Sequence, residues 1–242
     1  MRTVAVLGAG TMGAQIAAHL ANAGVSVWLL DLSEQVARDL LEKARKLKPD
    51  PFFVASNAAR IQTGGFDTHL QVLKQCDWVI EAVIERLDIK RDLLAKVEAN
   101  IGPATIVSSN TSGIPITLIA EGRSESFRKR WLGTHFFNPP RYLRLLEIIP
   151  TPETDPEMVQ FFMEYGDLYL GKQTVLCKDT PAFIGNRIGV YAMAKIYQLT
   201  TQLGVSIEEV DALTGPPLGR PKTGTFRLGD LVGHDTAAKV IQ

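Results

Sequence analysis

Residues 3–13 read Thr3-Val4-Ala5-Val6-Leu7-Gly8-Ala9-Gly10-Thr11-Met12-Gly13, and they set the fold of the chain. The first five residues are an apolar run typical of a buried strand, and glycines follow at once. Thr11 to Ala23 has the apolar spacing of a helix, which Gly24 closes, and Val25 to Leu30 is a second strand-like run. Strand, helix and strand in this order predict a βαβ unit with parallel strands.

Strand and helix patterns continue to alternate after this unit. Ser33 is placed to cap a helix that we expect to reach about Lys48, where Pro49 and Pro51 break it. Further on we predict strands over Asp77–Val83 and Thr105–Ser108, with a helix over Asp88–Asn100 between them. This alternation predicts an α/β fold with a Rossmann-like, doubly wound sheet.

The pattern changes after Pro150. We predict a helix over Asp155–Leu170, a short strand over Gln173–Cys177 and a boundary at Thr180-Pro181. From Asn186 onward the apolar spacing is helical, and the chain stops within the amphipathic run Asp235–Ile241. We therefore expect a Rossmann-like domain over residues 1–181, followed by the start of an all-helical domain over residues 182–242 that is incomplete.

Composition excludes several classes of function. The 242 residues include 26 basic and 26 acidic side chains, so a net charge of zero argues against binding nucleic acid or an anionic membrane. No apolar run reaches the ~18 residues that a membrane span needs, so membrane insertion is not expected. Cys76 and Cys177 are far apart, and no cluster of histidines and cysteines indicates a metal. Such sparse cysteine use fits a reduced compartment, and we expect a cytoplasmic protein.

The glycines between the first strand and the first helix predict a dinucleotide site. In a GxGxxG pattern, Gly8 permits the tight turn, Gly10 lets the main chain approach a pyrophosphate, and Gly13 lets helix and strand pack closely. Thr11 and Met12 begin the helix, whose N-terminus faces the phosphate charge. A glycine turn without a ligand is the alternative.

Asp31 ends the second predicted strand, where a carboxylate can accept hydrogen bonds from the ribose hydroxyls of adenosine. The same carboxylate would repel a 2′-phosphate, and no arginine follows directly to bind one. The sequence therefore favours NAD over NADP, unless Asp31 merely initiates the next helix.

His135 and Glu147 are the candidate chemical pair. His135 stands just past one predicted strand, in Gly133–Pro140, and Glu147 lies within the apolar run Leu145–Ile149. Neighbouring strands can bring them side by side, which suits an imidazole that takes up a proton beside an anion that stabilises the cation. The alternative is a histidine packed between aromatic rings, with Glu147 bound elsewhere.

Several motifs together resemble the L-3-hydroxyacyl-CoA dehydrogenases, in order and approximate spacing, from residue 1 to about residue 240. The resemblance rests on Gly8 to Gly13, Asp31, Glu81-Ala82-Val83-Ile84-Glu85, Ser109-Asn110-Thr111-Ser112, His135-Phe136-Phe137-Asn138-Pro139, Glu147, Lys178-Asp179-Thr180-Pro181 and Gly185-Asn186-Arg187. It implies oxidation of a (3S)-3-hydroxyacyl-CoA to the 3-ketoacyl-CoA with NAD, as in β-oxidation of fatty acids.

The resemblance also implies residue roles. His135 matches the catalytic base and Glu147 its partner, while Ser112 and Asn186 match residues that hold the substrate oxygens. The positions that match contacts to the nicotinamide side of NAD are Glu85, Lys90, Ser112 and Asn138. Simpler alternatives remain: Ser112 and Asn138 brace turns, Asn186 caps its helix, or Glu85 and Lys90 form an exposed helix pair.

Two departures from the family's pattern bear on the CoA contact and on the extent of the helical domain. Leu41–Gly65, where the family presents residues to CoA, is interrupted by Pro49 and Pro51, so we place no CoA contact there, although lysines and arginines between Lys43 and Lys48 can reach phosphates. The family's helical domain also continues further and mediates homodimers. We therefore expect a fragment, or the front of a longer polypeptide that is fused to another β-oxidation activity, and homodimerisation through the complete helical domain.

Two other functions stay open from the sequence. One is an NAD-dependent dehydrogenase of free 3-hydroxy acids, which keeps the histidine and glutamate but has no CoA contacts. The other is an NAD-binding structural or sensing protein without turnover.

Overall fold

The computed structural model describes residues 1–232, which form two compact units. The first is Met1–Thr180, and the second begins at Pro181, beside the boundary expected at Thr180-Pro181. The amphipathic run Asp235–Ile241 lies outside the described residues. Within residues 1–232, every helix is too short or too polar to cross a membrane.

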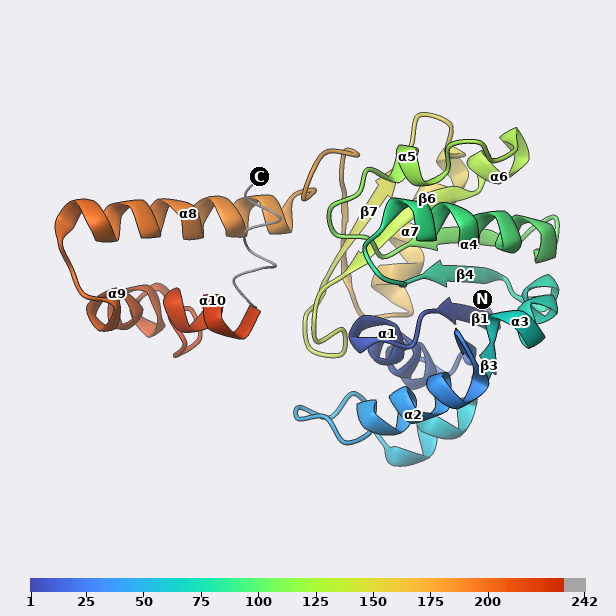
Figure 1. Cartoon of the computed structure of the whole chain (residues 1–242), viewed down its shortest axis with the longest axis horizontal. Helices are drawn as coiled ribbons and strands as arrows, with labels where there is room; N and C mark the ends of the chain where they lie inside the picture. The colour runs from blue at the N-terminus through green and yellow to red at the C-terminus, as the bar shows by residue number, and fades with distance from the viewer. Residues whose placement is uncertain (233–242) are drawn as a thin grey trace. The chain divides into compact units, whose positions relative to one another are not determined.

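A mixed eight-stranded sheet forms the centre of the first unit (Figure 1), with the strand order β3-β2-β1-β4-β5-β6-β7-β8. Strands β1 to β6 are parallel, β7 runs antiparallel to β6, and β8 is parallel to β7. The order of β1 to β6 is that of a Rossmann sheet and confirms the predicted fold class. The strands are β1 Thr3–Leu7, β2 Ser26–Asp31, β3 Ile61–Gly65, β4 Trp78–Glu81, β5 Ile106–Ser109, β6 Trp131–Phe136, β7 Leu145–Pro150 and β8 Gln173–Leu176.

Apolar helix faces cover both sides of this sheet. Val4 and Val6 of β1 belong to one buried cluster with side chains of α1, α2 and α7, and Figure 1 shows α4 on the other side of the sheet from α1. Successive side chains of a strand point to opposite faces, so a continuous apolar run is what a sheet covered on both faces requires. The helices of this unit are α1 Thr11–Asn22, α2 Glu34–Ala44, α3 Phe66–His69, α4 Leu87–Asn100, α5 Ile116–Ile119, α6 Glu125–Lys129 and α7 Pro156–Leu168, with short 3₁₀ turns η1 Ala55–Arg60 and η2 Leu70–Gln75.

Strand β3 and the end of helix α2 differ from the sequence-based prediction. Strand β3 was not predicted, because Ile-Gln-Thr-Gly-Gly contains one large apolar residue and two glycines; it forms by pairing with β2 at the sheet edge. Helix α2 ends at Ala44 instead of Lys48. Beyond it, the N–H groups of Lys46 and Leu47 donate to carbonyls three residues earlier, since the approach to Pro49 disfavours continued α-helix.

The second unit is helical over its described part, as predicted. Helix α8, Gly185–Leu203, ends where Gly204 adopts a left-handed conformation with φ of 64°, and Ser206 and Glu209 form a capping box that starts α9, Ile207–Thr214. The turn η3, Pro216–Leu218, and α10, Phe226–Val232, follow.

The buried His19 of α1 makes stability sensitive to acid. Its Nε2–H donates to the Leu170 carbonyl at 3.1 Å, and Nδ1 has no hydrogen-bond partner within residues 1–232. Burial, and secondarily the charge of Lys172, lower the pKa of His19 from 6.5 to about 4. The unfolded chain therefore binds more protons than the folded one between these values, so stability falls as the pH drops from 6.5 towards 4, by about 3 kcal/mol in total.

We expect His19→Gln, whose amide can still donate to Leu170, to lose most of this acid sensitivity. Urea unfolding at neutral pH and near pH 4 measures how much the free energy of unfolding of each protein falls between the two conditions. His69→Gln, which removes a partly exposed histidine of the same unit, serves as the control. An equal acid-induced loss in wild type and His19→Gln would contradict the assignment.

Candidate functional site

The glycine turn between β1 and α1 has the geometry that a dinucleotide site needs. Gly8 has φ of +100°, and a Cβ placed on it would lie 2.7 Å from the Ala82 carbonyl oxygen. A Cβ on Gly13 would lie 1.7 Å from the Gly8 oxygen, whereas one on Gly10 would meet open space. Thr11 and Met12 form the first turn of α1. Gly8 and Gly13 thus serve close packing, and the open side at Gly10 leaves the helix N-terminus accessible to an anion.

Asp31, the last residue of β2, is tied to this turn. Its Oδ2 accepts from the Ala9 N–H at 2.6 Å and its Oδ1 from the Leu32 N–H at 2.7 Å. Gly8, Gly10 and Asp31 line one pocket of about 490 Å³ at the carboxyl ends of the parallel strands. Its walls include side chains that sequence reasoning missed, because they are apolar or lie outside the motif: Leu40, Phe66, Ile84, Ile89 and Lys96.

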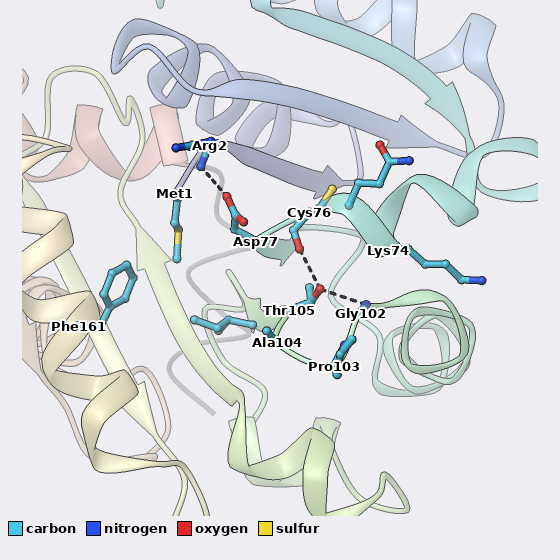
Figure 2. Close-up of a pocket in the computed structure, with 12 residues that line it drawn as sticks. Met1, Arg2, Lys74, Cys76, Asp77, Gly102, Pro103, Ala104, Thr105 and Phe161 are labelled. Carbon is cyan, nitrogen blue, oxygen red and sulfur yellow. Dashed lines mark hydrogen bonds between the residues drawn. The ribbon is translucent and has the colours of Figure 1, made fainter.

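A larger pocket of about 540 Å³ lies at the opposite, amino-terminal edge of the sheet (Figure 2). There the Asp77 carboxylate accepts from the main-chain N–H groups of Arg2 and Thr3, and the Thr105 hydroxyl donates to the Cys76 carbonyl. These polar groups satisfy one another within the fold. Ligands of open α/β sheets bind at the carboxyl ends of strands, so the pocket beside Asp31 is the better nucleotide site despite its smaller volume.

His135 and Glu147 lie opposite each other on paired strands. The sequence placed His135 just past a strand, but the structure puts it inside β6, in register with Glu147 of the antiparallel β7. His135 Nδ1 is 2.7 Å from Glu147 Oε2, and both side chains are buried. Because a carboxylate accepts, Nδ1 is the nitrogen that carries a proton, and in the neutral imidazole Nε2 is then an acceptor. Ser112 Oγ lies 3.0 Å from this Nε2, so Ser112, His135 and Glu147 form one hydrogen-bonded chain.

The loop after β5 places Ser112. Asn110 accepts from the Phe136 N–H through Oδ1 at 2.8 Å, which joins this loop to the end of β6. Glu85 Oε1 accepts from the N–H groups of Ser112 and Gly113 at 3.1 and 3.0 Å, and from the Thr111 hydroxyl. Asn110 and Thr111 were present in the matched motif, but only their contacts reveal that they position Ser112.

Lys90 is buried rather than part of an exposed helix pair. Its side chain is 1% exposed, and Nζ lies 2.7 and 3.0 Å from the two carboxylate oxygens of Glu81, whose side chain is wholly buried. Lys90 Nζ is also 3.3 Å from Glu85 Oε2. Ser109 Oγ donates to Glu81 at 2.6 Å. Sequence reasoning gave Glu81 no role, and a direct contact between Lys90 and nicotinamide stays a prediction.

The Lys90 ammonium also keeps Glu85 charged. Burial by itself would raise the pKa of Glu85, but the Lys90 ammonium and the hydrogen bonds from Thr111 and Gly113 outweigh burial and hold this pKa below its ordinary value. A charged Glu85 can therefore fix the loop that carries Ser112 at neutral pH.

The two remaining candidates are asparagines. Asn138 is exposed in the connection after β6, and its Oδ1 accepts from Gln15 Nε2 at 3.1 Å. Asn186 is the second residue of α8 and belongs to the second unit. It does not cap this helix, because the N-cap position is Ile184. The role of Asn186 towards substrate stays a prediction.

Comparison with known proteins identifies the family. Residues 3–180 match the family described as 3-hydroxyacyl-CoA dehydrogenase, NAD binding domain, and residues 183–242 match 3-hydroxyacyl-CoA dehydrogenase, C-terminal domain. The chain belongs to the 3-hydroxyacyl-CoA dehydrogenase family. Members of this family are oxidoreductases, and the match to its NAD binding domain assigns NAD as the cofactor.

Individual relatives agree with this family. A protein of Deinococcus radiodurans named "Probable 3-hydroxyacyl-CoA dehydrogenase" is 49% identical, over 99% of this chain and 71% of its own length. A Rickettsia felis protein provisionally named fatty acid oxidation complex trifunctional enzyme is 34% identical, over 97% of this chain but 34% of its own. The solved (S)-3-hydroxybutyryl-CoA dehydrogenase of Ralstonia eutropha is 32% identical with a TM-score of 0.83, covering 100% of this chain and 86% of that one.

Proposed function

We propose that this 3-hydroxyacyl-CoA dehydrogenase family chain oxidises (3S)-3-hydroxyacyl-CoA to 3-ketoacyl-CoA, with His135 as general base and Glu147 as its orienting partner. The observation that carries the proposal is the hydrogen-bonded chain from Glu147 through His135 to Ser112. Serine, histidine and carboxylate in this order also occur in hydrolases, so the geometry alone does not select a reaction. The glycine turn and the family favour hydride transfer.

His135 and Glu147 divide the proton chemistry between them. His135 Nε2 accepts the proton of the C3 hydroxyl while hydride departs from C3, which leaves a ketone. Glu147 keeps the proton of Nδ1 in place and stabilises the imidazolium that forms. In this proposal Ser112, whose Oγ lies beside the same Nε2, orients the substrate oxygen.

The pocket beside Asp31 is the proposed NAD site. Gly10 leaves the N-terminus of α1 open, and the Asp31 carboxylate lines the same pocket, where it suits ribose hydroxyls and repels a 2′-phosphate. When bound there, NAD supplies the acceptor for the hydride. The proposed contacts on the nicotinamide side are those that the family resemblance implies, namely Glu85, Lys90, Ser112 and Asn138.

NADH formation by the full-length protein that contains this sequence tests the proposal. We expect (S)-3-hydroxybutyryl-CoA to give a kcat/KM at least ~100-fold above that of free 3-hydroxybutyrate, because binding of the CoA group contributes to reaching the transition state. A preference for the free acid would favour the dehydrogenase of 3-hydroxy acids. NAD binding, seen as a higher melting temperature, without turnover of either compound would favour a structural or sensing protein.

We also propose that the helical unit mediates homodimerisation. Large apolar side chains of α8 are exposed, among them Ile188, Tyr191 and Leu203. Exposed apolar patches of this kind mark interaction surfaces. Light scattering that shows a monomer at micromolar concentration would contradict a dimer.

The second proposal about partners is that this chain is part of a longer polypeptide. The chain spans about a third of the Rickettsia relative, whose name describes three activities of fatty acid oxidation. We therefore propose fusion to a further β-oxidation domain in the full-length protein. The length of the native polypeptide, measured by mass spectrometry, tests this proposal.

A further inference from the structure

Residues 137–144 link β6 to β7 and thereby join the strands of His135 and Glu147; we name them the β6–β7 connection. This segment also carries Asn138, the proposed nicotinamide contact. Its inner side is held by two buried side chains that the proposed mechanism does not use, Gln15 of α1 and Lys172 before β8.

Lys172 binds the main chain of the β6–β7 connection. Its side chain is 2% exposed, and Nζ donates to the carbonyl oxygens of Pro140 and, at 2.9 Å, Leu143. The ammonium also lies 5.7 Å from the centre of the Phe136 ring. In residues 1–232, Lys172 forms no salt bridge with a carboxylate. A buried cation is therefore held by carbonyl dipoles and an aromatic ring, two partners that offer it partial negative charge.

Burying the Lys172 ammonium without a carboxylate partner in the described residues costs free energy. Burial removes the Lys172 ammonium from water and thereby lowers its pKa to about 8. The nearby titratable group on α1 is His19, which also binds this region through the Leu170 carbonyl. An apolar side chain would avoid the desolvation of a charge but would leave the carbonyls of Pro140 and Leu143 without their donor. The fold therefore uses Lys172 to hold this connection in one conformation.

Gln15 holds the side chain of Asn138 directly. Gln15 is 5% exposed, and its Nε2 donates to the Thr11 carbonyl at 2.9 Å and to Asn138 Oδ1 at 3.1 Å. Because the Asn138 oxygen accepts this bond, the N–H groups of its amide are the part of the side chain left to donate to another partner. A carboxamide held in this way presents donors and is fixed at the start of the β6–β7 connection.

We propose that Gln15 and Lys172 are positioning residues that fix the β6–β7 connection so that Asn138 presents its amide N–H groups to the dinucleotide. The inference rests on the proposed function, since it assumes that Asn138 contacts NAD. Gln15 acts on the side chain of Asn138 and Lys172 on the main chain that follows it.

The test is the dissociation constant of NADH, measured by fluorescence titration, which needs no turnover. We expect Lys172→Met to raise the NADH dissociation constant tenfold or more. Gln15→Leu should raise this constant about fivefold, the effect of one lost hydrogen bond. Lys74→Met, at an exposed lysine, and Gln71→Leu, which also removes a bond to a main-chain carbonyl, are the matched controls and should leave it unchanged.

A double-mutant cycle separates positioning from general stability. If Gln15 acts through Asn138, then Gln15→Leu added to Asn138→Ala should change the NADH constant no further. Lower melting temperatures with an unchanged NADH constant in both Gln15→Leu and Lys172→Met would overturn the inference. If Lys172→Met does not fold, the NADH constant of Gln15→Leu and the double-mutant cycle decide whether the inference stands. A wild-type protein that binds NADH but does not oxidise acyl-CoA would contradict the proposed function. The NADH dissociation constants of the variants would still test the positioning roles of Gln15 and Lys172.

Discussion

His135→Gln is expected to lower kcat for 3-hydroxyacyl-CoA oxidation by ~10²–10⁴-fold, the usual contribution of a positioned general base. Glutamine can retain a hydrogen bond to Glu147, which lies 2.7 Å from the imidazole in the wild type, but it cannot take up the hydroxyl proton. Steady-state rates of NADH formation measure the loss.

The dissociation constant of NADH should stay within about threefold of wild type in His135→Gln, because His135 reaches Glu147 and Ser112 rather than the glycine turn. His69→Gln, at a histidine beside β3, is the control and should retain full activity. If His135→Gln kept kcat within a few-fold of wild type, His135 would not be the base.

The second large effect concerns stability. Lys90→Met is expected to lower the free energy of unfolding by about 3–5 kcal/mol, the usual effect of leaving one member of a buried ion pair uncompensated. Glu81 is completely buried, and Lys90 donates to both of its oxygens, at 2.7 and 3.0 Å. Urea-induced unfolding at neutral pH, with the slope m compared between proteins, measures the change.

A second substitution shows whether the unpaired charge is the cause. Glu81→Gln added to Lys90→Met should recover part of the lost stability, since it removes the buried charge while the amide oxygen still accepts one bond. Lys129→Met, which breaks an exposed pair with Glu125 at 2.8 Å, should change stability little. Similar losses for Lys90→Met and Lys129→Met would refute the buried-pair explanation.

The cofactor turn was the part of the candidate site that sequence reasoning described best. Gly8, Gly10 and Gly13 act within one short turn, and Asp31 follows at the end of the next strand, so a local pattern contains the geometry. That His135 and Glu147 lie side by side was also predicted, because consecutive strands are often neighbours; the structure pairs these two strands antiparallel.

The buried polar network could not be predicted in the same way. Lys90 suggested an exposed helix residue or a cofactor contact, and Glu81 had no suggested role, yet together they hold Glu85 and the loop that carries Ser112. Whether a charged side chain faces solvent or the interior depends on which strand lies beside its helix. Residue spacing does not contain that information.

The sequence by itself determined the Rossmann-like α/β class, the glycine turn and the family, because these depend on residues close together in the chain and on motifs in a set order. Tertiary structure alone decided that β3 forms at the sheet edge, and that Gln15 reaches Asn138 across 123 residues of sequence. It also decided that Lys172 binds the carbonyls of the β6–β7 connection. Such contacts arise when strand order and burial bring distant polar groups together, and each group must then find a partner because water is excluded.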